Sequence, residues 1–103
     1  MKRILVRYKV KSADVHENER LIKKVYQELH AAAIDGFHYA TFKLADGISF
    51  VHVAFSDTEE ANSKFNQLPA FKDFQANIKS RCDEFPVVTP LTEIGSYNFV
   101  FTS

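Results

Sequence analysis

The amino-acid sequence predicts an α+β domain with a ferredoxin-like βαββαβ order and an antiparallel sheet. Three observations support this prediction. Apolar residues alternate near the N-terminus, two stretches with helical spacing follow acidic residues, and Asp46-Gly47 separates two strand-like segments. Elements in this order form the split βαβ arrangement. The 103 residues suit a single domain that spans 1–103.

The first strand and the first helix follow from a change in periodicity. Residues 3–10 alternate between two faces, as a strand requires. The residues that share the apolar face are Ile4, Val6, Tyr8 and Val10. Asp14 followed by Glu17 has the form of a capping box, which predicts a helix start. Asp35-Gly36 predicts the helix end, because glycine tolerates a left-handed conformation.

The central hairpin is predicted over residues 37–45 and 48–55, which are rich in aromatic and β-branched residues. Asp46-Gly47 predicts a two-residue turn in which both positions have a positive φ. The turn sets the register of the two strands, so Thr41 is expected opposite His52.

The second half of the chain repeats the pattern of helix and strand. Residues 56–60 carry the second capping signature, and Pro69 breaks the helix and precedes a shorter one through residue 78. Phe85-Pro86 returns the chain to an extended conformation. We expect a fourth strand over 87–94, at an edge because it contains Pro90, and a short terminal strand over 97–101.

Composition restricts the classes of partner. The 13 basic and 13 acidic residues give zero net charge, so we expect no nucleic-acid partner. A single cysteine, Cys82, cannot form an internal disulfide, which suits a reducing compartment. We see neither a signal peptide nor an apolar run of the roughly 20 residues that a membrane span needs, and therefore expect no membrane partner and a cytoplasmic location.

Both faces of the predicted hairpin are apolar. We predict that one face lies under the helices; it carries His38, Ala40, Phe42, Val51, Val53 and Phe55. The opposite face keeps large side chains where a solvated sheet would be polar; it carries Tyr39, Ile48, Phe50 and His52. This predicts a homodimer through the second sheet face. Scattered surface aromatics are the simpler alternative.

Four stretches of the sequence carry a resemblance to a known family. They are the opening strand Arg3-Ile4-Leu5-Val6-Arg7-Tyr8, the Asp46-Gly47 hairpin, the run from Asn66 to Phe74 with its Pro-Ala-Phe step, and Pro86-Val87-Val88. Together they resemble the dimeric α/β-barrel superfamily, in particular the antibiotic-biosynthesis-monooxygenase-like domains, over almost the whole chain. The resemblance implies two sheets packed into a barrel and a pocket between sheet and helices. It also implies chemistry that differs among relatives: some oxidise phenols with O₂ and no flavin or metal, and others degrade haem or isomerise lactones.

The sequence departs from this family at functional positions. The phenol oxidases and the haem degraders resemble each other in using a tryptophan, and this chain has none. Haem-degrading relatives also place an asparagine on the first strand, where this chain has Arg7 and Tyr8, and a histidine on the last helix, where residues 71–81 have none. We therefore expect no haem degradation and no bound cofactor.

The candidate site residues come from the strands and the second helical region. The four histidines lack the spacing of a helical zinc site, so no metal is expected. His38 is the candidate catalytic base. The candidate substrate-binding residues are Arg7, Tyr8, Tyr39, Phe42, Phe55, Phe65 and Phe71. For His52 a structural role is favoured, and Cys82 lacks a redox partner motif.

Three functional hypotheses follow, and whether the protein is an enzyme stays open among them. The leading one is a cofactor-independent monooxygenase-like enzyme that acts on a small aromatic, phenol- or quinol-type substrate. The second is a non-catalytic small-molecule-binding or stress-associated dimer, whose narrow pocket is filled by Phe42, Phe55, Phe65 and Phe71. The third is an interaction module with exposed aromatics that is monomeric in solution.

Overall fold

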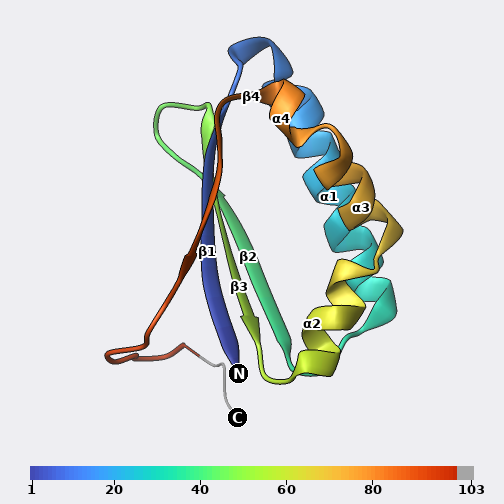
Figure 1. The fold of residues 1–103 in the computed structure, drawn as a ribbon, viewed down its shortest axis with the longest axis vertical. Helices are drawn as coiled ribbons and strands as arrows, with labels where there is room; N and C mark the ends of the chain where they lie inside the picture. Colours follow the sequence, from blue (N-terminus) through green and yellow to red (C-terminus); the bar gives the residue numbers. More distant parts are fainter. Residues whose placement is uncertain (100–103) are drawn as a thin grey trace.

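A computed structural model describes residues 1–99 of the chain, and the predicted βαββαβ order is confirmed (Figure 1). The second helical region is divided into three short helices. The elements are β1 (Lys2–Val10), the 3-10 turn η1 (Ser12–Asp14), α1 (Val15–Ala32), β2 (Phe37–Lys43), β3 (Ser49–Ser56), α2 (Glu59–Asn66), α3 (Pro69–Ala76), α4 (Ile78–Arg81) and β4 (Cys82–Pro90).

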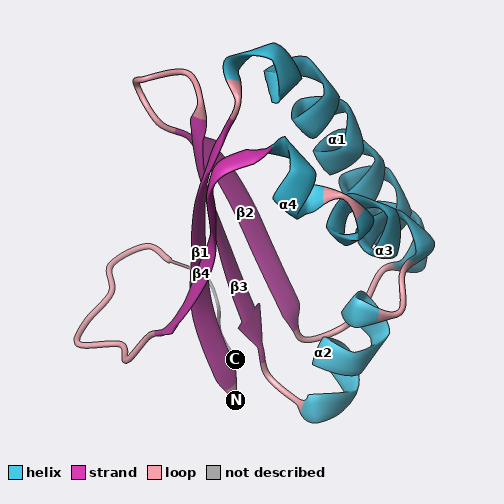
Figure 2. Cartoon of the chain, turned by 45° about the horizontal axis from the view of Figure 1, so that its top comes forward, coloured by secondary structure: helices cyan, strands magenta, loops and turns pink. Residues whose placement is uncertain are grey.

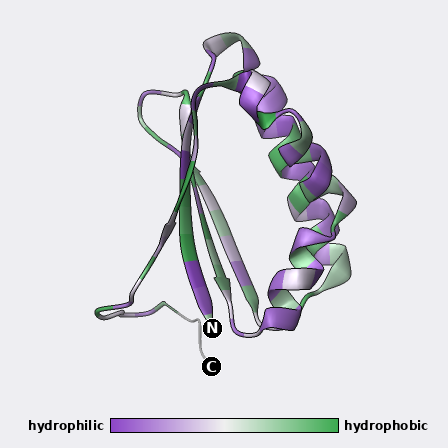
Figure 3. Ribbon diagram, viewed as in Figure 1, coloured by the Kyte–Doolittle hydropathy of each residue, from purple (hydrophilic) through white to green (hydrophobic). Residues whose placement is uncertain are grey.

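The strands form one antiparallel sheet in the order β2-β3-β1-β4. All the helices cover the same face of this sheet (Figures 1 and 2). On the opposite face, residues of the 91–99 segment line a shallow pocket with Arg3 and Phe55, and no helix lies over that face within the described residues; we call it the uncovered face. In Figure 3 the strands are hydrophobic over much of their length, whereas the helices alternate between hydrophilic and hydrophobic positions. The helices therefore bury one apolar stripe each. Apolar side chains stand on both faces of the sheet, with Tyr8 and Phe50 buried on the helical side and Leu5 paired with Val53 on the other.

The predicted hairpin register is confirmed, and Thr41 pairs with His52. The turn differs from the predicted one, because the strands stop at Lys43 and Ser49 and only Gly47 has a positive φ, of 78°. The Asp46 carboxylate closes this longer loop by accepting bonds from the amides of residues 48 and 49 at 3.0 and 2.8 Å and from the Ser49 hydroxyl at 2.6 Å. These bonds, the hydroxyl's above all, lower the pKa of Asp46 to about 2.

Helix α1 begins as predicted, with Asp14 at its N-cap, but it lacks the predicted capping bond and ends earlier than Asp35-Gly36. Asp14 makes no side-chain capping bond, and Glu17 instead accepts two 2.7 Å bonds from Arg20. The helix ends before Ala33, which adopts the left-handed conformation with a φ of 49°. Gly36 lies in the loop between α1 and β2. Glycine is required there because its φ is 75° and a Cβ would lie 3.3 Å from the Asp57 Cβ.

Strand β4 is longer at its start and shorter at its end than the predicted 87–94. Its edge position, expected from Pro90, is confirmed. Two register shifts against β1 add residues to β4, one of them between Glu84 and Val87 where Pro86 cannot donate to the ladder. Of the predicted terminal strand over 97–101, residues 97–99 form none, and residues 100–101 lie outside the described residues.

The prediction of which hairpin face lies under the helices is wrong, because the two faces are exchanged. Phe50 is 2% exposed in the core, whereas Phe42 is 59% exposed. In the β1–β3 pairing Tyr8 lies opposite Phe50, and Val6 lies opposite His52. Directly paired residues share a face, so the apolar face of β1 brings His52 and Phe50 under the helices. The face expected to bind a second subunit is thus covered by the chain's own helices.

Candidate functional site

A cavity of about 360 Å³ lies between the helix-facing side of the sheet and the helices α2, α3 and α4. This is within the size range of small-molecule sites. Its walls are mainly aromatic and aliphatic. The lining residues are Ile4, Val6, Tyr8, Phe37, Tyr39, His52, Ala54, Asn62, Phe65, Asn66, Phe71, Phe74, Gln75, Ile78, Lys79, Pro86 and Val88.

Aromatic rings in contact make one wall of the cavity. Phe65 from α2 lies 4.3 Å from Phe37, 4.4 Å from Phe71 and 4.8 Å from Tyr39, measured between ring centroids. Contacts at these separations are favourable for aromatic pairs. Strand β2 and helices α2 and α3 thereby form a packed aromatic surface against which a flat ligand can lie.

His52 is the polar centre of the cavity. Its side chain is 4% exposed and lies between two tyrosines. Nε2 is 2.7 Å from the Tyr8 Oη, and Nδ1 is 2.6 Å from the Tyr39 Oη and 3.2 Å from the Thr41 Oγ1. The sheet register assembles this group, because Thr41 is paired with His52 and Tyr8 lies on the adjacent strand.

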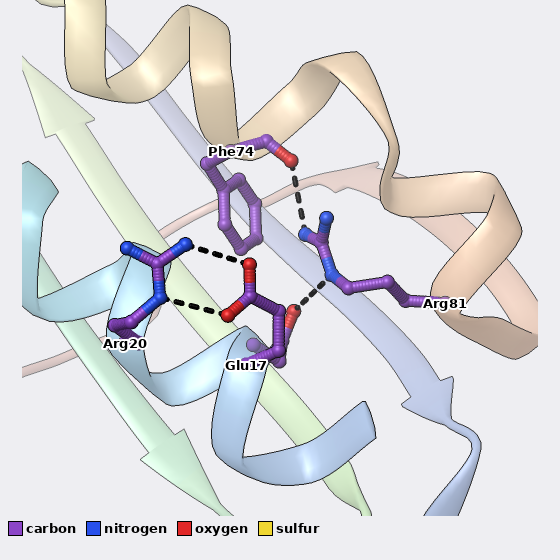
Figure 4. A network of polar contacts seen from close by, with 5 residues as sticks. Glu17, Arg20, Phe74 and Arg81 are labelled. Carbon is purple, nitrogen blue, oxygen red and sulfur yellow. Dashed lines mark hydrogen bonds and ion pairs between the residues drawn. The ribbon is translucent and has the colours of Figure 1, made fainter. Parts of the chain in front are cut away.

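The hydrogen bonds continue from His52 into the core. Asn18 of α1 donates from Nδ2 to the Tyr8 Oη at 3.0 Å. Arg81, at the end of α4, donates from Nε to the Asn18 Oδ1 at 3.2 Å and from Nη2 to the Phe74 carbonyl at 2.9 Å (Figure 4). Arg81 lies over the Phe74 ring at 5.2 Å. We call the line Arg81–Asn18–Tyr8–His52–Tyr39 the buried chain.

Burial sets the charge of these groups. It lowers the pKa of His52 to about 4, so the imidazole is neutral at pH 7. It also raises the pKa of both Tyr8 and Tyr39, so both phenols remain protonated. The part of the cavity around His52 thus consists of neutral groups that both donate and accept hydrogen bonds.

Four of the residues predicted to bind substrate line this cavity: Tyr8, Tyr39, Phe65 and Phe71. The other predicted site residues are Arg7, Phe42, Phe55 and His38, and they alternate onto the uncovered face of the sheet. Arg7 and Phe42 are exposed there, and Phe55 lies under the Arg3 guanidinium at 5.4 Å. His38 is half-buried, 3.5 Å from the Asp57 carboxylate.

Sequence reasoning did not assign Asn18 or Arg81 to the site and placed His52 on the wrong face. A signal for Asn18 was present, because it shares a helical stripe with the buried residues Leu21, Ile22 and Val25. For Arg81 we find no sequence signal. It is buried where the end of α4 meets Asn18 of α1 and the Phe74 carbonyl of α3, a tertiary arrangement that local patterns do not contain.

Metal-ligand clusters and membrane spans are absent from the described part of the chain. Within residues 1–99 no three His, Cys, Asp or Glu side chains are grouped so that they could hold a metal ion. No helix there is both long and apolar enough to cross a membrane. Cys82 is a buried free thiol whose pKa is raised by burial.

The fold and the cavity define an α+β protein with a ferredoxin-like sheet and an apolar site beneath its helices. No family model and no curated protein matches the chain in sequence. Solved structures match its fold. Rv0793 from Mycobacterium tuberculosis has a TM-score of 0.75 at 17% identity, over 91% of this chain and 95% of that one. A protein described as antibiotic biosynthesis monooxygenase has a TM-score of 0.75 at 11% identity, over 92% and 100%.

A third similar structure is a variant of SnoaB, described as a cofactor-independent oxygenase from Streptomyces nogalater. It has a TM-score of 0.69 at 16% identity, over 93% of this chain and 95% of that one. The chain therefore has the fold of antibiotic-biosynthesis-monooxygenase-like proteins, as the sequence resemblance implied.

Proposed function

We propose that the protein is a monooxygenase-like enzyme that binds a small aromatic, phenol- or quinol-type molecule in the cavity and needs no bound cofactor. One observation carries the proposal: a neutral imidazole and two tyrosine hydroxyls lie together at the wall of an otherwise apolar, ring-lined cavity. The names of two similar structures, an antibiotic biosynthesis monooxygenase and a cofactor-independent oxygenase, support the same class of reaction.

The reaction requires only the substrate and O₂. An electron-rich phenolate supplies the electrons, one atom of O₂ becomes the second carbonyl of a quinone, and the other leaves as water with the two hydrogens that the phenol loses, one from its O–H and one from the ring carbon that is oxygenated. The protein contributes orientation against the aromatic wall, exclusion of water and hydrogen bonds to the substrate oxygen. The histidine of the site is His52 and not His38, because His52 lines the cavity; it acts through the Tyr8 and Tyr39 hydroxyls to which it is bonded.

The alternative function is a non-catalytic small-molecule-binding or stress-associated protein. That hypothesis expects a narrow pocket filled by four phenylalanines. Phe42 and Phe55 instead lie on the uncovered face, and a histidine and two tyrosines line the open volume. This geometry favours the enzyme over the filled pocket.

Oxygen uptake tests the proposal. With 1-naphthol as probe, the protein should raise the rate of O₂ consumption above that of the buffer, and His52→Gln should lower the increment by at least about tenfold, because it removes the hydrogen-bond partner of both tyrosine hydroxyls. His38→Gln is the matched control and should retain the increment within about twofold, because its side chain is outside the cavity lining. Binding of the probe without faster O₂ uptake would instead support the non-catalytic alternative.

We further propose that the uncovered face of the sheet binds a second copy of this chain. It is the opposite face from the one expected at first, and it carries Leu5, Ala40, Phe42, Val51, Val53, Phe55 and Val87. An apolar sheet face of this kind needs a cover, and a self-complementary twofold contact supplies one. Residues 91–99 project from the sheet on this side (Figure 2), with Ile94 and Tyr97 exposed.

A further inference from the structure

The direction of the hydrogen bonds in the buried chain can be deduced from Arg81, because a guanidinium group only donates. Arg81 is 5% exposed and Asn18 is 0% exposed, and no ion pair within residues 1–99 involves Arg81. Its Nε donates to Asn18, so the atom of Asn18 that faces it must be the amide oxygen. The amide nitrogen of Asn18 therefore faces Tyr8 and donates to it.

This donation determines how Tyr8 uses its own proton. The Tyr8 oxygen accepts from Asn18, and its hydroxyl then donates to the Nε2 of His52 at 2.7 Å. A neutral imidazole whose Nε2 accepts a bond carries its proton on Nδ1. His52 is thus held in the Nδ1–H form by residues of α1, α4 and β1.

The last step reaches the cavity. The Nδ1–H of His52 donates to the Tyr39 Oη at 2.6 Å, with Thr41 at the longer distance of 3.2 Å. Thr41 is itself bonded to the Tyr26 hydroxyl at 2.8 Å. The Tyr39 oxygen accepts the imidazole proton. Its own O–H is left to donate, either to Thr41, with which the Tyr39 side chain is also hydrogen-bonded, or to a ligand that takes the place of Thr41. Among these hydroxyls beyond His52, that of Tyr39 is the one whose residue lines the cavity.

We propose that the buried chain makes Tyr39 a hydrogen-bond donor to the ligand, so that the cavity selects aromatic molecules whose oxygen is a carbonyl or an ionised phenol. Both nitrogens of His52 are occupied by tyrosines, so neither faces a ligand as a free base. His52 is then a positioning residue that orients Tyr39. The presence of an aromatic ligand rests on the proposed function. The direction of the hydrogen bonds in the buried chain is independent of that function.

The direction is tested first in the free protein by ¹⁵N NMR of the histidine side chains at pH 7. We expect His52 to carry its proton on Nδ1. In Asn18→Asp the introduced carboxylate accepts from both Arg81 and Tyr8, so Tyr8 turns its proton away and His52 must shift its proton to Nε2. Asn62→Asp is the control: it adds the same charge at the cavity wall but outside the buried chain, so His52 should keep its proton on Nδ1. An Nε2–H imidazole in the wild type overturns the proposal, even if Asn18→Asp does not fold.

The ligand side is tested by the binding of 1-tetralone, which has a carbonyl, and tetralin, which lacks one. We expect the wild type to prefer 1-tetralone, and Tyr39→Phe to weaken 1-tetralone about tenfold while changing tetralin less than about twofold. Asn18→Asp should weaken 1-tetralone as well, although Tyr39 is intact. Equal weakening of both ligands by Tyr39→Phe would overturn the donor role. If neither molecule binds the wild type, the proposed function fails and the donor role of Tyr39 fails with it. The NMR spectrum of the free protein still decides the direction of the hydrogen bonds in the buried chain.

Discussion

His52 couples the candidate site to the stability of the fold. Its pKa is lowered to about 4 in the folded state by burial, against about 6.5 in an unfolded chain. Between these values the unfolded state binds more protons, so stability is lost as the pH falls through this window. We expect the His52-dependent part of the loss to be about 2 kcal/mol between pH 7 and pH 5.

Urea unfolding at the two pH values measures this effect. His52→Gln removes the titrating group, so its free energy of unfolding should fall less between pH 7 and pH 5 than that of the wild type. His38→Gln should follow the wild type within experimental error if the effect belongs to the buried imidazole. Equal losses in the wild type and in His52→Gln would show that burial of His52 does not control the pH dependence.

At the residue scale the sequence could predict much of the cavity but not its polar centre. The aromatic character of Tyr8, Tyr39, Phe65 and Phe71 predicts that they line it, and they do. His52 was misplaced because both hairpin faces are apolar, so the hairpin alone cannot show which one is buried. The decisive information is the pairing of β1 with β3, which links the apolar face of β1 to His52.

At the scale of elements, the helix starts show where local patterns are reliable. The pattern of Asp14 and Glu17 predicts a capping box, but the Asp14 side chain makes no such bond. Thr58 does cap α2, accepting from the Ala61 amide at 3.1 Å. The backbone at the cap position differs between the two helices: Thr58 is extended, with φ −138° and ψ 160°, as a cap requires, whereas Asp14 ends the 3-10 turn with φ −107° and ψ 5°.

This difference predicts unequal effects of two substitutions. Thr58→Ala should lower the free energy of unfolding by about 1 kcal/mol, because it leaves an amide of α2 without its partner. Asp14→Ala should cost no more than about 0.5 kcal/mol, because it removes no capping bond. Thermal or urea unfolding of both variants decides the matter, and a larger loss in Asp14→Ala would mean that this carboxylate caps α1 in solution.

At the scale of the whole molecule, the uncovered sheet face predicts the state of assembly. Light scattering should give twice the 11.8 kDa mass of one chain. Phe42→Glu should shift the mass toward that of one chain without unfolding it, because Phe42 is exposed on this face. Lys72→Glu, an exposed position on the helical side, is the control and should leave the mass unchanged. A wild type that remains a single chain at micromolar concentration would contradict the dimer.

The overall fold was predictable because strand-like and helix-like spacing of apolar residues follow each other along the sequence in the order of the observed elements. Strand, helix, hairpin, helix and strand can be assembled in few ways, so the sheet order needs little beyond the sequence pattern. The bulged path of β4 was not predictable, because it depends on how an edge strand accommodates Pro86 against β1.

Strand β4 has a consequence for how such a protein diversifies. Pro86 and Val88 line the cavity, yet they belong to an edge strand whose residues from Asp83 onward are largely exposed. Replacing them would reshape the ligand site while removing little buried surface. Substitutions at these β4 positions could therefore change ligand selectivity with little effect on the stability of the fold. Substitutions on the His52 side of the cavity would change the buried core as well.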